Sequence, residues 1–120
     1  MTVGDANQRV TVQVRTETPD GKDGVTEAWA DLAPRRRAAR VKPLAGRDLE
    51  RARAVDPRIS HEVTLFYWRA YRAHLVGGRA QLVYHPTSAS ADDRELEIIT
   101  APIDVDELHT DVVLQCKELA

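Results

Sequence analysis

Alternation of apolar and polar residues is the main pattern of the chain, and it predicts a series of short β-strands. Val10, Val12 and Val14 alternate with polar residues, which is the period-two pattern of a strand with one buried face. Further strand-like segments follow at residues 25–33, 36–42, 61–68, 79–84, 96–100 and 112–116. Turn-forming residues separate several of them. The sequence therefore predicts a mainly β protein, a small antiparallel β-barrel or sandwich of six or seven strands with long loops.

Residues 45–55 depart from this alternation and predict one short helix. Leu49, Ala52 and Val55 recur at three-residue spacing, which places them on one face of a helix. The segment ends before Pro57, which cannot continue a helix. No internal repeat or second domain is visible, so the 120 residues are expected to form a single domain.

Two side chains of the predicted strands are expected to face the interior. Trp29 is the expected buried anchor of residues 25–33, and Cys116 alternates with polar neighbours in the last strand. Cys116 is also the only cysteine, so no intrachain disulfide can form. The small domain must then be held together by packing or by association, and a reducing compartment fits this composition.

Charge is unevenly distributed although the whole chain is nearly neutral. The composition is 42% hydrophobic and 30% charged with a net charge of −2, which is typical of a soluble globular protein and gives no overall drive toward nucleic acid. Residues 35–58 contain nine basic and three acidic residues, whereas residues 92–120 contain nine acidic and two basic residues. This asymmetry predicts oppositely charged surfaces that steer docking between copies or partners, with two ordinary solvated faces as the alternative.

The residue types used in catalysis and metal binding lack the spacing that such sites require. The four histidines, His61, His74, His85 and His109, form no short pair with cysteine or carboxylate of the kind found in zinc sites. Gly77 and Gly78 form a lone pair rather than a phosphate-binding loop. We therefore expect no catalytic residue, metal ligand or cofactor; a small enzyme would need a pocket of converging titratable groups.

The ends of the chain carry no sign of export or membrane insertion. Residues 1–15 lack the basic start and apolar run of a signal peptide, and no stretch approaches the roughly 18 apolar residues of a membrane span. We expect no membrane contact, and a protein made and used in the cytoplasm or in a particle assembled there.

A nucleic-acid-binding module is the main alternative from another class. The basic run at residues 35–42 could contact phosphates, and Tyr67, Trp68 and Tyr71 could stack on bases. Aromatic residues on the strands of so small a barrel are more often part of the core. A monomer of this kind would bind single strands with an affinity that falls steeply with salt.

The order of these elements resembles the head-closure family of tailed bacteriophages, also called head-tail joining or stopper proteins. The likeness runs through the opening strand at residues 9–13, the Asp20–Gly21 turn, Trp29, and residues 40–44 leading into residues 46–49. It continues through residues 61–65 with Tyr67, the Gly78–Arg79 turn and the closing strand at residues 113–118. The resemblance therefore covers nearly the whole chain.

This resemblance implies a non-enzymatic virion protein of the phage neck, assembled in the host bacterial cytoplasm. Such a subunit would form a six- or twelve-fold ring between the portal and adaptor above and the tail terminator or tail tube below. The ring would retain packaged DNA until ejection and touch it without sequence specificity. An adaptor or tail-completion protein of the same neck is a close alternative, and the particle would be a phage, a prophage remnant or a gene transfer particle.

The resemblance also suggests where moving and docking residues lie. Rings of this family commonly plug the channel with a loop, and residues 16–24 and 85–93 are the polar candidates: Asp20, Lys22, Asp23, His85, Ser88, Asp92 and Asp93. A cyclic ring joins one patch to a different patch on the next copy. We expect a basic patch of Arg36, Arg40, Lys42, Arg47 and Arg51 to meet an acidic patch of Asp104, Asp106 and Glu107 on a neighbour or partner.

Overall fold

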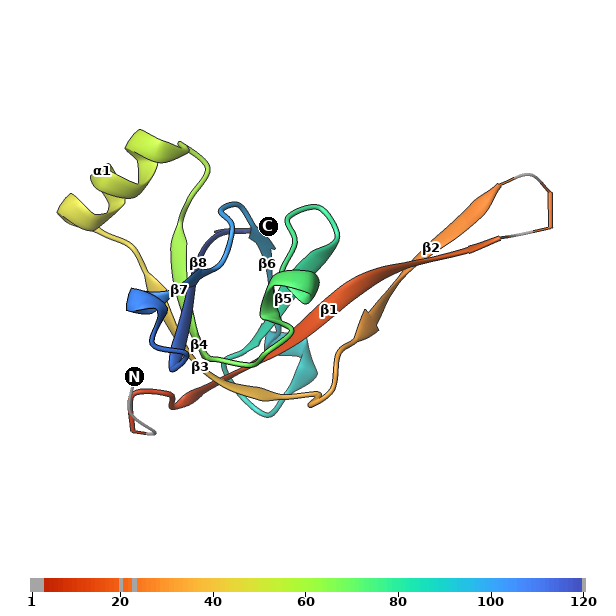
Figure 1. Ribbon diagram of the computed structural model, residues 1–120, viewed down its shortest axis with the longest axis horizontal. Coiled ribbons are helices and arrows are strands. Elements are labelled where there is room, and N and C mark those ends of the chain that lie inside the picture. Colours follow the sequence, from red (N-terminus) through yellow and green to blue (C-terminus); the bar gives the residue numbers. More distant parts are fainter. Residues whose placement is uncertain (1–3, 20, 23, 120) are drawn as a thin grey trace.

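The computed structural model describes residues 4–19, 21–22 and 24–119, and these residues form a mainly β fold (Figure 1). The strands are β1 (Gln8–Pro19), β2 (Val25–Asp31), β3 (Arg37–Pro43), β4 (His61–Phe66), β5 (Ala80–His85), β6 (Arg94–Ile98), β7 (Ile103–Asp104) and β8 (Asp111–Glu118). The helices are α1 (Gly46–Val55), the single turn α2 (Tyr71–His74), and the 3₁₀ turns η1 (Ser90–Asp92) and η2 (Val105–Glu107). The predicted helix at 45–55 is confirmed, whereas α2 was not predicted.

Six of the strands close into an antiparallel barrel. The sheet runs in the order β2-β1-β3-β4-β8-β6-β5. An additional pairing between β1 and β5 closes the strands from β1 to β5 into the barrel and leaves β2 outside it. Strand β1 pairs with β3 through Gln8–Val10 and with β5 through Arg9–Val14. The predicted fold class is therefore confirmed, in its barrel form.

The alternating apolar residues of the strands fill the barrel. Val10 and Val12 of β1, Val63 of β4 and Leu114 of β8 are fully or almost fully buried in one cluster. Cys116 lies in the same cluster, as predicted, and burial raises the pKa of its thiol to about 12. The period-two pattern thus found the core, because in a small barrel alternate side chains point inward.

Helix α1 covers one end of the barrel through a second, smaller core. Ala52 packs there with Leu44 and Ile59, and Leu49 adds a partly buried contact. The outer residues of α1 remain exposed, so its arginines lie at the surface.

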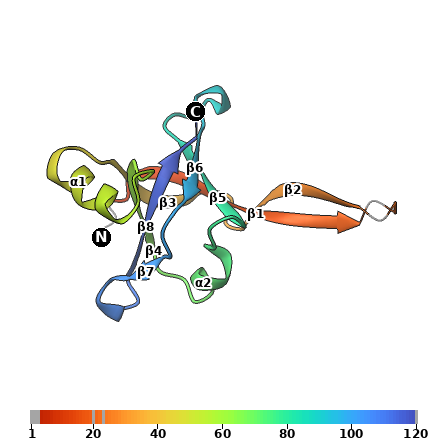
Figure 2. The ribbon, with the colours of Figure 1, turned by 90° about the horizontal axis from the view of Figure 1, so that it is seen from above.

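The outer half of β1 leaves the barrel together with β2 as a two-stranded ribbon. The pairing of β1 with β5 ends at Val14, whereas its pairing with β2 continues to Pro19. The ribbon projects along the longest dimension of the molecule, which measures 50 Å against 33 and 30 Å for the others (Figures 1 and 2). The predicted loop at 16–24 is therefore strand up to Pro19. Asp20 and Asp23 lie outside the described residues.

The expectation that Trp29 is buried is wrong. Its side chain is 43% exposed, and every residue of β2 is exposed. The reason is that the ribbon has no second layer of structure over it, so a strand residue there lacks the core that it would have inside the barrel.

His61 gives the barrel a pH-dependent stability. Its ring is buried next to Glu118, and burial lowers its pKa from the ordinary value of 6.5. Below pH 6.5 the unfolded chain then binds a proton more readily than the folded one, so stability falls as pH falls through this range. We expect the urea midpoint of the wild type to drop more between pH 7.5 and 5.5 than that of His61→Gln. Equal drops would contradict this assignment.

Candidate docking surfaces and tethered loop

Four of the five predicted basic residues are exposed on β3 and on the helix α1 that follows it. Arg40 and Lys42 point outward from β3, and Arg47 and Arg51 lie on the exposed side of α1. Lys42 and Arg51 line the same shallow hollow of about 240 Å³. The Lys42 ammonium lies 3.3 Å from the Asp48 carboxylate, so part of this positive charge is already balanced within the chain.

Arg36 lies apart from this group. It precedes β3, at the end of that strand away from α1, and lines a separate hollow with Pro34 and Phe66. We call the exposed residues Arg40, Lys42, Arg47 and Arg51 the basic surface, and their docking on a neighbour or partner stays a prediction.

The predicted acidic residues lie on a tight turn between β7 and β8, and they have different roles. Asp106 and Glu107 are exposed, and both have left-handed backbones with φ of 52° and 53°. Asp104 is only 8% exposed; its carboxylate accepts a hydrogen bond of 3.0 Å from the backbone N–H of His109. Asp104 therefore shapes the turn, while Asp106 and Glu107 form the acidic turn that can meet a partner.

The α1 part of the basic surface and the acidic turn lie at opposite ends of strand β4, whereas Arg40 pairs with Thr64 and so lies toward the acidic-turn end. Pro43, just before α1, pairs with His61 at the start of β4. Leu65, near the end of β4, pairs with Val112, which also pairs with Asp104. Four residues of strand separate these points, or about 13 Å. Surfaces of opposite charge at opposite ends suit a head-to-tail contact better than a two-fold one.

The segment at residues 85–93 is tied to the barrel by a relay of three side chains. The Thr11 hydroxyl lies 2.7 Å from Nε2 of His85, and Nδ1 of His85 lies 2.9 Å from the Asp93 carboxylate. Within the segment, Thr87 donates a hydrogen bond of 2.6 Å to Asp92. These bonds, and the turn η1, give this candidate plug loop more internal structure than its composition suggested. Its mobility stays a prediction.

The spacing of Thr11, His85 and Asp93 matches that of a catalytic triad, but the chemistry does not follow. Thr11 is buried in the middle of β1, and its hydroxyl donates a hydrogen bond to the backbone carbonyl of Arg35. A nucleophile must be free to reach a substrate and to give its proton to the histidine. Here the relay fastens a loop to a strand.

Breaking this relay should loosen the loop without unfolding the barrel. We expect His85→Ala to speed amide hydrogen exchange in residues 86–93 about tenfold or more, because hydrogen bonds worth about 1 kcal/mol each are lost. Ser88→Ala, an exposed change in the same segment, is the control. Exchange measured by mass spectrometry that is the same in both variants would show that the relay does not hold the loop.

The aromatic residues of the nucleic-acid alternative are engaged within the chain. The guanidinium of Arg37 lies 4.1 Å from the centre of the Trp68 ring. Tyr67 stacks on His109 with 4.8 Å between ring centres and meets Tyr71 edge-on at 5.5 Å. Sequence reasoning missed both the Arg37 and the His109 contacts, because each joins segments far apart in the chain. The rings that were to stack on bases instead fasten β4, α2 and the acidic turn together.

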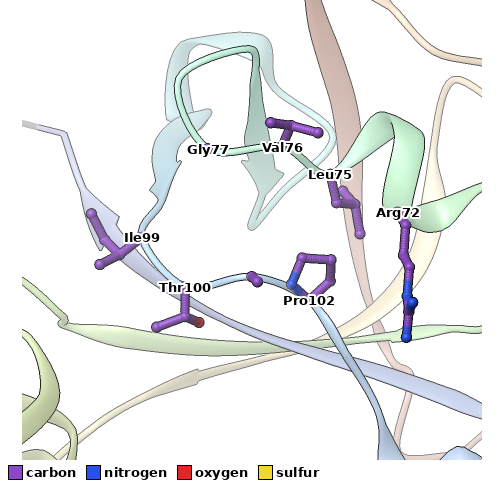
Figure 3. Close-up of a pocket in the computed structure, with 8 residues that line it drawn as sticks. Arg72, Leu75, Val76, Gly77, Ile99, Thr100 and Pro102 are labelled. Atoms are coloured by element: carbon purple, nitrogen blue, oxygen red, sulfur yellow. The ribbon is translucent and has the colours of Figure 1, made fainter.

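A mostly apolar groove lies beside α2 (Figure 3). It measures about 520 Å³ and is lined by Arg72, Leu75, Val76, Gly77, Ile99, Thr100, Ala101 and Pro102. Arg72 is the one ionisable side chain among them. The groove therefore fits an apolar group of a partner better than a substrate that needs acid-base chemistry. In the part of the chain that the structure describes, no three histidine, cysteine or carboxylate side chains cluster as a metal site would require.

A small closed barrel with a projecting ribbon and separate charged surfaces defines a structural, assembly-type protein. The chain belongs to the phage head completion protein family, whose model matches residues 1–119. The suspected family is thereby confirmed, and with it a role in closing the phage head as a structural component of the virion. Among the helices described, none combines the length and the apolar character needed to span a membrane.

A solved structure supports the fold. The chain is similar to the solution structure of protein SF1141 from Shigella flexneri 2a, with a TM-score of 0.70 and 19% sequence identity. The match covers 100% of this chain and 98% of that one. At this identity the likeness shows a common fold. The search of the curated proteins finds no match.

Proposed function

We propose that this chain is the subunit of a six- or twelve-fold ring in the phage neck, docked on the portal or adaptor and receiving the tail on its other side. The observation that carries the proposal is the separation of Arg47 and Arg51, on α1, from the acidic turn by the length of β4. Around a closed ring, the basic surface of each copy meets the acidic turn of the next. The same charges would guide the first encounter between copies.

We further propose that the ring holds the packaged DNA until ejection, with the β1–β2 ribbon reaching into the channel. Two features support the ribbon over residues 85–93 as the plug. It projects farthest from the barrel, whereas the relay through His85 ties the other segment down (Figure 1). The exposed Lys22 near its tip can contact DNA phosphate without sequence specificity.

The ring is tested by native mass spectrometry and negative-stain imaging of the full chain, alone and mixed with its portal or adaptor, at low and moderate salt. Rings of six or twelve copies, free or only on the partner, support the proposal. A monomer that ignores every neck protein but binds single-stranded DNA would overturn it in favour of the nucleic-acid alternative.

The plug is tested separately in assembled particles. A variant that replaces residues 18–26 by Asn-Gly shortens the ribbon but leaves the barrel intact, since β1 pairs with β5 only up to Val14. We expect particles with this variant to form necks yet lose DNA on storage. Full retention of DNA would show that the ribbon is not the plug, which would then be residues 85–93 or another protein.

A further inference from the structure

The ribbon exposes a large aromatic side chain that its own chain has no means of covering. Trp29 is 43% exposed and lies opposite Arg15 in the β1–β2 register. Val25, on the same face of the ribbon, is 56% exposed. A two-stranded ribbon in water is marginal in stability, and exposed aromatic residues of this size are typical anchors of protein interfaces. These features indicate that the ribbon is covered by a partner.

The groove beside α2 offers a matching site. Its apolar wall comes from Leu75 and Val76 on one side and from Ile99, Ala101 and Pro102 on the other (Figure 3). A volume of about 520 Å³ is ample for an indole ring. The Trp29 of the same chain does not fill it, since no residue of β1 or β2 lines the groove and the ribbon points away from the barrel (Figure 2).

Charges around the two sites are complementary. Trp29 lies beside Glu27, and Glu17 faces Glu27 across the ribbon; the two carboxylates share the single guanidinium of Arg15, at 3.8 and 3.5 Å. The groove carries the opposite sign through Arg72. A guanidinium can also pack on the face of an indole.

We propose that Trp29 of one copy docks in the groove of the next copy, between Val76 and Pro102. This inference rests on the ring proposed above and names the contact that joins its subunits in addition to the charged surfaces. Each copy gives one ribbon and receives one, so the contact can pass from copy to copy around a ring.

Engineered cysteines test the contact directly, because the native Cys116 is buried and does not compete. The double variant Glu27→Cys with Ala101→Cys leaves Trp29 in place and should give, under mild oxidation, a ladder of disulfide-linked oligomers that ends at the ring size. The matched control pairs Glu27→Cys with Ser88→Cys, an exposed position that does not line the groove. It should stay uncrosslinked.

Truncating the Trp29 side chain tests how much this contact contributes to assembly. Trp29→Ala should leave the melting temperature nearly unchanged but raise the protein concentration needed for ring formation at least about tenfold, as expected for a buried aromatic anchor. Val25→Ala is the control on the same face. Filling the groove with Ala101→Trp should block assembly in the same way while Trp29 is intact.

The outcomes separate this inference from the proposed function. The Trp29 contact is overturned, and the ring proposal stands, if three results come together. The wild type forms rings, Trp29→Ala forms them as readily, and the cysteine variant gives no disulfide ladder. If Trp29→Ala abolishes binding to the adaptor while the ladder is absent, Trp29 docks on that partner and the contact between copies is refuted. If the wild type forms no ring with or without partners, the proposed function fails, and this inference fails with it.

Discussion

Replacing Leu114 by alanine will lower the free energy of unfolding by about 3 kcal/mol, the usual cost of removing a leucine side chain from a closed core. Leu114 is 1% exposed and lies on β8, opposite Val63 of β4. The barrel closes around this position, so its walls have little freedom to collapse into the space left behind. A loss of this size is a large part of the stability of a domain of this length.

The measurement is urea unfolding followed by circular dichroism, with Leu108→Ala as the matched control. Leu108 ends the acidic turn and is 66% exposed, so the same chemical change should cost less than about 0.5 kcal/mol. Equal losses in the two variants would mean that the inward face of β8 is not the core of the barrel.

The sequence predicted the barrel because its inward residues follow a strict local rule. In β4 and β8 burial alternates residue by residue, whereas in β1 Thr11 is buried as well as Val10 and Val12. This local rule could not predict that β1 pairs with β5 to close the barrel, because that pairing depends on how strands far apart in the chain meet.

Trp29 is the residue for which the local pattern of strand residues gave a wrong prediction of burial. A tryptophan among strand residues predicts burial when a second layer covers the strand, but the sequence does not say whether that layer exists. Residues 16–24 were predicted to be a loop, whereas β1 continues to Pro19. The resulting projection is a property of the whole fold, and it left an expected core residue exposed.

The candidate site was predicted in part for a similar reason. Charge density along the chain located the basic surface, because Arg40, Lys42, Arg47 and Arg51 are close in sequence and stay close in space. It did not reveal that Asp104 is buried to shape the acidic turn, or that Asp93 fastens a loop through His85. Those roles depend on hydrogen bonds that only the folded chain makes.

Reversing two charges of the basic surface should prevent ring formation. In the double variant Arg40→Glu and Arg47→Glu, each subunit would bring carboxylates against the acidic turn of the next, where attraction was expected. Like charges brought together at an interface cost several kcal/mol, so we expect assembly to fail at concentrations at least a hundredfold above the wild-type midpoint. Both residues are exposed, so the fold should survive.

Restoring the attraction on the other side decides whether these two surfaces meet each other. Adding Asp106→Lys and Glu107→Lys to the reversed chain re-creates opposite charges between copies and should recover rings, whereas either pair of changes alone should not. Arg79→Glu, at an exposed arginine outside both the basic surface and the acidic turn, is the control for charge reversal and should assemble normally. If the reversed chain assembles as the wild type does, the basic surface has no part in the ring. If it fails and the added lysines do not rescue it, the basic surface meets a partner other than the acidic turn.

Rescue that weakens as salt rises from 50 to 500 mM would identify the contact as electrostatic, because screening shortens the reach of exposed charges to a few ångströms at high ionic strength.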